Sequence, residues 1–206
     1  MKNLIALRWC QVLAVSLILG LVVVAANTFW CQIQPQTPAY VQKIGADFTL
    51  RSTNGPLALH DFRGQVVLLY FGYTHCPDAC PTALGTISGA IRELPLTMRS
   101  RVAGLFVSLD PERDTPAICD AYAHFFHPAI HGVTGTPTQL AKIARSWRVN
   151  YAIPSHAPGS NYALSHSTFI YLVDTHGKVR ALFGDHSTRQ EISRELRVWL
   201  SASLAS

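Results

Sequence analysis

The chain has 206 residues, 49% of them hydrophobic, which suffices for one well-buried domain with an appendage but not for two ordinary domains. Its 17 Lys and Arg residues only slightly outnumber its 12 Asp and Glu residues. Because the basic residues are scattered along the chain, no stripe of the kind that binds nucleic acid is visible. We therefore expect no nucleic-acid partner and interpret the charge as favouring solubility.

The N-terminal part predicts a membrane anchor. Residues 9–30 carry no charge and, at ~1.5 Å per residue, cross the ~30 Å hydrocarbon core of a bilayer as a helix. Lys2 and Arg8 precede this segment, so residues 1–8 should be cytoplasmic. The expected topology is a single-pass inner-membrane protein with its domain on the periplasmic side. A signal peptide cleaved near residues 24–26 is the alternative, and it also implies export.

After the anchor, an uncharged linker at residues 31–42 contains Pro35 and Pro38 and should lift the domain, residues 43–206, off the membrane. The expected elements of that domain follow in chain order. They are a hairpin at 48–50 and 57–59, a strand at 65–71, a helix at 82–94, a strand at 102–109, a helix from 115, a strand at 130–133, a helix at 136–147, a hairpin at 169–173 and 178–183, and a helix at 188–200.

This alternation of strands and helices, ending in a hairpin and a helix, is the thioredoxin-like order. It predicts an α/β fold with a central mixed sheet flanked by helices. The strand at 65–71 is continuously apolar after its first residue, which is typical of a strand covered on both faces.

Cys76 and Cys80 lie where the strand at 65–71 gives way to a helix. A thiolate at a helix N-terminus is stabilised by free backbone N–H groups, which makes it both a nucleophile and a metal ligand. Pro77 and Pro81 favour a rigid loop around the two sulfurs. A disulfide, a redox couple and half of a metal site all remain open at this point.

A metal site would need a further ligand, because the domain offers no second cysteine pair for a closed four-cysteine zinc site. Among nine histidines, His166 shortly precedes the strand at 169–173. In a thioredoxin-like order, the loop before that strand approaches the cysteine helix, so position favours His166. Cys119 is expected to be a small buried hydrophobic residue without a functional role.

Three separated motifs resemble the Sco/SenC family of copper proteins. They are YTHCPDACP at residues 73–81, DPERDTP at 110–116 and YALSHST at 162–168. The resemblance runs in order from about residue 43 to the C-terminal helix.

The resemblance implies a membrane-tethered thioredoxin-like metallochaperone that helps to assemble the copper centre of cytochrome c oxidase. It makes Cys76, Cys80 and His166 the ligands of copper, as Cu(I) or Cu(II). The implied partners are the oxidase subunit that carries the copper centre and a copper donor protein. Four charged residues of the motifs are expected to support the site or form a partner surface: Asp78, Asp110, Arg113 and Asp114. For Asp114, capping of the following helix together with Thr115 is an equally open alternative.

The alternative is an enzyme, a thiol-disulfide oxidoreductase whose Cys76 and Cys80 thiols reduce the cysteines of the oxidase copper site and are themselves oxidised to a Cys76–Cys80 disulfide. Thioredoxin-type enzymes usually have two residues between the cysteines and a proline before the facing strand. Here three residues separate the cysteines, and residues 165–168 contain no proline. The sequence therefore favours the metallochaperone.

Overall fold

The computed structural model describes residues 16–24, 37–155 and 161–203. The chain divides into two units, Met1–Gln36 and Thr37–Ser206. In the first unit, residues 16–24 are helical and exposed. Within the described ranges, no helix is long and apolar enough to span a membrane. The rest of the predicted anchor at 9–30, the cytoplasmic residues 1–8 and most of the linker lie outside the described residues.

The second unit begins at Thr37, inside the predicted linker at 31–42. The 3-10 helix η1, Val41–Lys43, buries Val41 in the core of the domain. The guanidinium of Arg180 donates a hydrogen bond to the Thr37 hydroxyl at 3.3 Å. The last residues of the predicted linker therefore pack on the domain instead of forming a tether.

A five-stranded mixed sheet forms the centre of this unit, in the order β5-β4-β3-β8-β9. The first three of these strands are parallel, whereas β8 pairs antiparallel with both β3 and β9. The strands are β3 (Val66–Gly72), β4 (Val102–Ser108), β5 (Ile130–Val133), β8 (Ile170–Val173) and β9 (Val179–Phe183). The parallel strands β3 and β4 end at the same edge of the sheet, where the cysteine motif begins.

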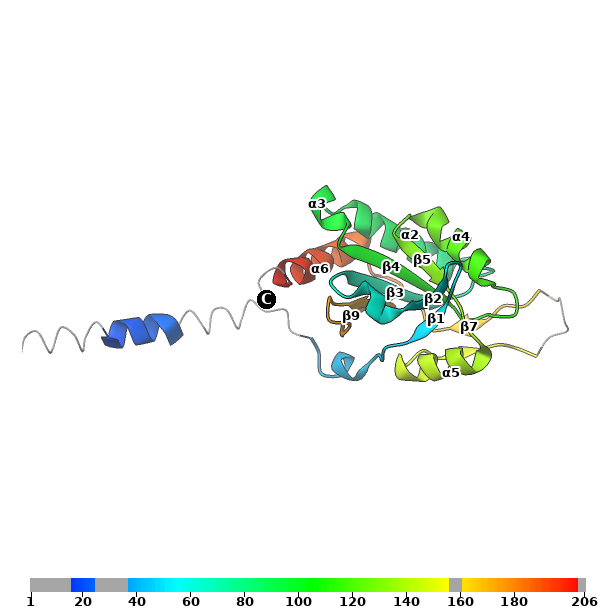
Figure 1. Ribbon diagram of the computed structural model, residues 1–206, viewed down its shortest axis with the longest axis horizontal. Helices are drawn as coiled ribbons and strands as arrows, with labels where there is room; N and C mark the ends of the chain where they lie inside the picture. Colours follow the sequence, from blue (N-terminus) through cyan, green and yellow to red (C-terminus); the bar gives the residue numbers. More distant parts are fainter. Residues whose placement is uncertain (1–15, 25–36, 156–160, 204–206) are drawn as a thin grey trace, which may run out of the picture. The chain divides into compact units, whose positions relative to one another are not determined.

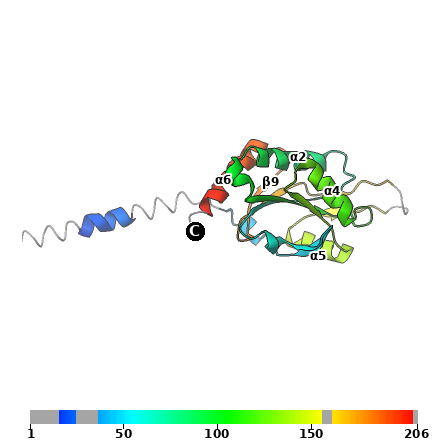
Figure 2. The ribbon, with the colours of Figure 1, turned by 45° about the horizontal axis from the view of Figure 1, so that its top comes forward.

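Helices cover both faces of the sheet (Figures 1 and 2). On one face lie α2 (Ala79–Arg92), α4 (Pro116–Phe126) and α6 (Arg189–Ala202), and α5 (Pro137–Ser146) lies on the other. Shorter elements complete the unit: β1 (Thr49–Ser52), β2 (Gly55–Ala58), the 3-10 helix η2 (Leu59–Phe62), α3 (Leu96–Arg99), β6 (Tyr151–Ala152) and β7 (Ser165–His166). The result is the predicted three-layer α/β arrangement.

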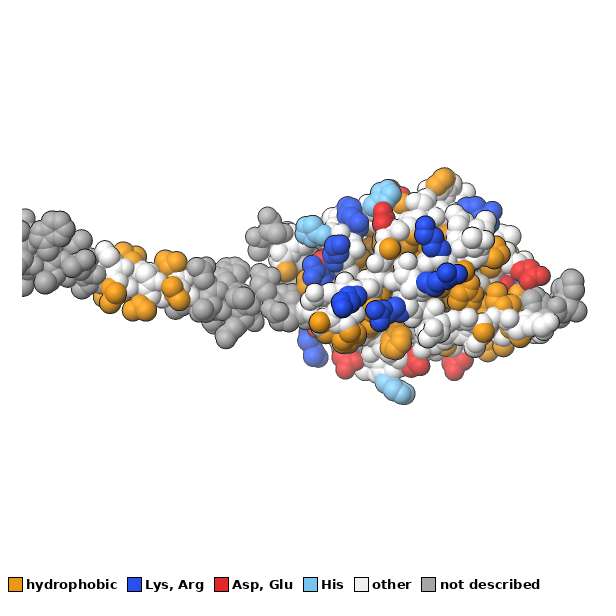
Figure 3. Space-filling view, turned by 90° about the horizontal axis from the view of Figure 1, so that it is seen from below, with side chains coloured by type: hydrophobic (Ala, Val, Ile, Leu, Met, Phe, Trp, Pro, Cys, Tyr) orange, Lys and Arg blue, Asp and Glu red, His pale blue; other side chains and the backbone are white. Residues whose placement is uncertain are grey.

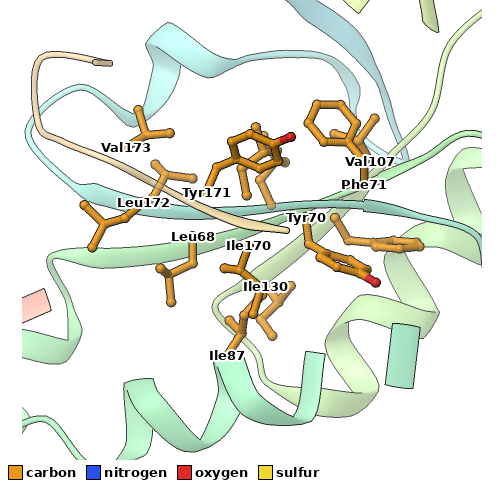
Figure 4. Packing of buried hydrophobic residues seen from close by; sticks show 14 of the residues in the cluster. Leu68, Tyr70, Phe71, Ile87, Val107, Ile130, Ile170, Tyr171, Leu172 and Val173 are labelled. Atoms are coloured by element: carbon orange, nitrogen blue, oxygen red, sulfur yellow. The ribbon is translucent and has the colours of Figure 1, made fainter. Parts of the chain in front are cut away.

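The alternating side chains of the central strands build the two halves of the core (Figure 4). Leu68 and Tyr70 of β3 point toward Ile87 of α2, whereas Phe71 lies on the opposite face beside Tyr171. All seven residues of β3 are buried, which confirms the prediction of a strand covered on both faces. Burying a large apolar side chain stabilises the folded state by about 1.5–3 kcal/mol, so the side chains of β3 contribute strongly to the stability of the domain.

The predicted helices and strands are confirmed with boundary shifts of a few residues. The sequence analysis did not predict α3, η2 or the two-residue pair β6–β7. These elements are too short to show the periodicity that identifies a helix or strand.

On the face shown in Figure 3, Lys and Arg side chains are spread among neutral and hydrophobic ones. This distribution agrees with the scattered basic residues of the sequence. The side chains drawn there form no continuous basic stripe.

Helix α4 approaches the edge strand β5 very closely at Gly132. A Cβ atom at this position would overlap the backbone carbonyl of Cys119 in α4. Because backbone atoms cannot move aside as a flexible side chain can, α4 can pack here only against glycine.

We predict that Gly132→Ala lowers the free energy of unfolding by about 1–3 kcal/mol, because α4 must shift away from β5. The control is Gly85→Ala in α2, where a Cβ would meet nothing within 4 Å. That substitution should instead stabilise by about 0.5–1 kcal/mol, since alanine is the better helix former. Urea unfolding of the two variants measures both effects, and equal stabilities would contradict the packing described here.

Candidate metal centre

The two motif cysteines lie where β3 passes into α2. Cys80 is in the first turn of α2 and is fully buried, whereas Cys76 lies in the preceding loop and is partly exposed. The backbone N–H of Cys80 points to the Cys76 sulfur at 3.4 Å. Pro81 occupies the first helical turn, as predicted, where its missing N–H costs no hydrogen bond. Both cysteines are unbonded thiols.

His166 reaches the cysteines from β7, which pairs with β6 through Tyr151. Its Nδ1 lies 2.9 Å from the carbonyl oxygen of Ser167. A carbonyl oxygen can only accept, so Nδ1 carries the proton and Nε2 keeps its lone pair. Nε2 lies 3.5 Å from the Cys80 sulfur. The backbone hydrogen bond therefore turns the ligating nitrogen toward the thiols.

Two tyrosine rings also hold the imidazole of His166. Tyr70 of β3 meets it edge-on with ring centroids 6.1 Å apart, and Tyr73 does so at 5.8 Å. Both tyrosines are buried. These contacts restrict rotation of the ring and surround one side of the site with aromatic surface.

The structure brings all three predicted ligands together. One donor atom each of Cys76, Cys80 and His166 lies within 4.8 Å of the others. Gly72, the last residue of β3, makes room for this cluster, because a Cβ there would lie 2.6 Å from the Cys80 sulfur. The sequence analysis missed Gly72, although its position at the end of an apolar strand suggested a close approach.

Burial changes the protonation of two of these groups. It raises the pKa of the Cys80 thiol well above its ordinary value, which favours the neutral thiol. Burial also lowers the pKa of His166, which keeps its imidazole neutral. Two sulfurs and one neutral imidazole are donors suited to soft transition metals.

Asp114 fastens the loop that carries Cys76. Its carboxylate is fully buried and accepts hydrogen bonds from the Thr74 backbone N–H at 2.8 Å and the Thr74 hydroxyl at 2.5 Å. The Ser108 hydroxyl, at the end of β4, donates to the same carboxylate at 2.5 Å. The α4 cap is Thr115, whose hydroxyl accepts from the Ile118 N–H. Asp114 is therefore a link between β4 and the cysteine loop and not the helix cap.

Asp110 and Arg113 fasten the segment that precedes His166. The guanidinium Nε of Arg113 donates to the buried Asp110 carboxylate at 2.6 Å. The Tyr162 hydroxyl donates to the other oxygen of Asp110 at 2.6 Å, and Arg113 also donates to the Tyr162 carbonyl at 3.0 Å. The guanidinium lies 3.5 Å from the centroid of the Tyr162 ring. Tyr162 belongs to the 162–168 motif, but the sequence analysis gave it no separate role.

Asp78, the last of the four charged residues singled out in the sequence, has no comparable position. It precedes α2, is exposed, and accepts a hydrogen bond from the Thr82 hydroxyl at 3.4 Å. His75, next to Cys76, lies outside the three-donor cluster and approaches Asp114 at 3.6 Å. Cys119 is fully buried, as predicted.

The chain matches the SCO1/SenC family model over residues 36–201. It is 35% identical to Protein SCO2, mitochondrial, of Saccharomyces cerevisiae over 161 residues, which are 77% of this chain and 54% of that protein. The SCO2-like protein of Rickettsia felis is 36% identical over 157 residues, 75% of this chain and 76% of the relative. The chain thus spans only about half the length of the yeast relative.

A solved structure supports the same relationship. The structure of Bradyrhizobium japonicum ScoI with copper bound is 36% identical and superposes with a TM-score of 0.68, covering 76% of this chain and 99% of that one. The likeness confirms the thioredoxin-like fold predicted from the order of elements. Together with the family match over most of the domain, it establishes that the chain belongs to the SCO1/SenC family.

Proposed function

We propose that this chain is a metallochaperone that binds one copper ion through Cys76, Cys80 and His166. The observation that carries the proposal is the convergence of these three donors within 4.8 Å. The copper-bound state of Bradyrhizobium japonicum ScoI, a 36% identical relative, supports copper as the metal. The delivery target would be the copper centre of cytochrome c oxidase, as the resemblance of the motifs implies.

The donor set suits both oxidation states of copper. Two thiolates and one imidazole give the low coordination number that Cu(I) accepts, and a further weak ligand would complete the site for Cu(II). Cys76 and His166 are partly exposed, whereas Cys80 is buried. A sulfur ligand of a partner could therefore reach the copper from the side of Cys76 and take it over by ligand exchange.

Copper loading would be coupled to protons and to thiol redox state. Because burial favours the protonated Cys80 thiol, copper must displace this proton, and loading should strengthen as pH rises. A Cys76–Cys80 disulfide would remove two of the three donors at once. Oxidation of the thiols would then release the metal.

We also propose that residues 9–30 form a single-pass anchor in the inner membrane, with the domain on the periplasmic side. The uncharged length of this segment and the preceding Lys2 and Arg8 support this topology. A copper donor protein and the oxidase copper-centre subunit would meet the domain there.

The second candidate function is thiol-disulfide exchange with the oxidase subunit. One observation favours it: the Cys80 N–H, at the start of α2, points to the partly exposed Cys76 sulfur. A partly exposed sulfur is the one that a partner's disulfide can reach. Cys76 would be the attacking sulfur and Cys80 the resolving one.

For the chaperone, we predict that the reduced chain binds one Cu(I), and that His166→Ala weakens this binding. Mutation of a residue that only hydrogen-bonds to a metal ligand typically lowers metal affinity about 10–100-fold. Loss of a direct ligand should therefore lower the Cu(I) affinity at least about tenfold. Competition with a Cu(I) chelator measures the affinity. The matched control is His75→Ala, which removes a motif histidine outside the cluster and should leave the affinity unchanged. Equal affinities of the two variants would remove His166 from the site.

A second prediction concerns the protonation of His166 in the metal-free protein. Burial lowers its pKa below the ordinary value of 6.5, so its imidazole stays neutral at a pH where an unfolded chain is already protonated. Between these two pKa values, acidification therefore destabilises the folded state through this group. An NMR titration should give a midpoint below 6.5 for His166 in the folded protein and near 6.5 in urea. A folded-state midpoint at or above the urea value would contradict the described burial.

The two candidate functions differ in their need for His166, since thiol exchange requires only the cysteines. We expect cells that carry His166→Ala as their only copy to lack an assembled oxidase copper centre, although the thiols of the variant remain reducible. Cys76→Ser should fail under both functions and serves as the loss-of-function reference. Normal oxidase assembly with His166→Ala would favour the oxidoreductase.

A further inference from the structure

A second cluster of metal-ligating side chains lies on α4 and β5. Asp120 and His124 are one helical turn apart on α4, and His131 is on β5. One donor atom from each of the three lies within 4.8 Å of the others. The cysteines contribute nothing to this cluster. In the sequence, His124 and His131 showed only as two of nine histidines.

The fold brings these residues together through two features. A spacing of four residues places Asp120 and His124 on the same face of α4, with Asp120 Oδ1 and His124 Nδ1 3.1 Å apart. Gly132 lets α4 approach β5, and its N–H points to Asp120 Oδ1 at 3.4 Å. The rings of His124 and His131 consequently meet edge-on, with centroids 5.8 Å apart.

The spacing of the donors fits a metal ion. Ligands at bond lengths of 2.0–2.2 Å in tetrahedral geometry lie roughly 3–3.5 Å from one another. Asp120 Oδ1 and His124 Nδ1 are already at this separation. His124 Nδ1 also faces the Asp120 carbonyl oxygen at 2.9 Å and therefore carries the ring proton, so an ion binds through Nδ1 only when this proton moves to Nε2 and the hydrogen bond is given up. The donor atom of His131 lies within 4.8 Å of the other two and must move closer to share an ion with them. His124 is exposed, so water can complete the coordination.

We propose that Asp120, His124 and His131 bind a divalent transition-metal ion such as Zn²⁺. Two imidazoles and one carboxylate lack the thiolate that favours Cu(I), and they suit divalent ions instead. The site is separate from the cysteines, because strand β4 lies between β5 and β3. The proposal therefore does not depend on copper delivery.

Another histidine shows that a His–Asp contact alone does not make such a site. His60 Nδ1 lies 2.6 Å from Asp47, and its Nε2 lies 3.8 Å from Asp61. These carboxylates face different nitrogens of the ring, so one ion cannot be coordinated by His60 and both carboxylates at once. His60 is thus a matched control: an exposed histidine with carboxylate neighbours but without the shared centre.

The test uses the full chain with Cys76→Ser and Cys80→Ser, which removes both thiols of the proposed copper site and makes failure of the copper proposal irrelevant to the result. Calorimetric titration with Zn²⁺ should find one ion per chain. Adding His124→Ala should weaken binding at least about tenfold, whereas adding His60→Ala should not change it. With Co²⁺ as a spectroscopic probe, the parent should show d–d bands without thiolate charge transfer, and these bands should disappear with His124→Ala.

Asp120→Asn provides a second variant, because the amide keeps the Oδ1 acceptor for the Gly132 N–H while removing the charge. It should also weaken Zn²⁺ binding, with an unchanged circular dichroism spectrum as the check on folding. If the parent with Cys76→Ser and Cys80→Ser binds no Zn²⁺, the proposal is wrong. Equal Zn²⁺ affinities of the His124→Ala and His60→Ala chains would also overturn it.

Discussion

Two buried carboxylates in the segment that follows β4 determine how the cysteine–histidine site is arranged. Asp114 binds the loop before Cys76, and Asp110, through Arg113, binds the segment before His166. Both carboxylates are fully buried, and each accepts several hydrogen bonds. Removing one partner of a buried ion pair lowers the free energy of unfolding by about 3–5 kcal/mol, because the remaining charge is left without compensation. The short 110–114 segment therefore ties two distant parts of the chain to the same edge of the sheet.

The donors Cys76, Cys80 and His166 are held in place by contacts within the protein. The Ser167 carbonyl fixes the orientation of the His166 ring, and Gly72 leaves space for the Cys80 sulfur. A site held in this way loses little conformational entropy when an ion enters. Partial exposure of Cys76 keeps one sulfur accessible, as the proposed uptake and release of copper would require.

Much of this could be predicted from the sequence. The apolar run of β3, Pro81 in the first turn of α2, and the family motifs identified the fold and the three donors. The short strand β7 could not be predicted, because two residues show no period. Nor could the cluster around His131 be found, since it depends on how closely α4 packs against β5. Asp114 was expected to support the site, but the motif does not show that it does so by binding Thr74 in the cysteine loop.

The most direct measurement is X-ray absorption at the copper edge of the reduced, Cu(I)-loaded chain. If Cys76, Cys80 and His166 form the site as their positions indicate, the first shell should contain two sulfurs and one imidazole nitrogen. The outer-shell scattering of a histidine ring should also be present. A shell that contains sulfur alone, with no imidazole contribution, would contradict the proposed site.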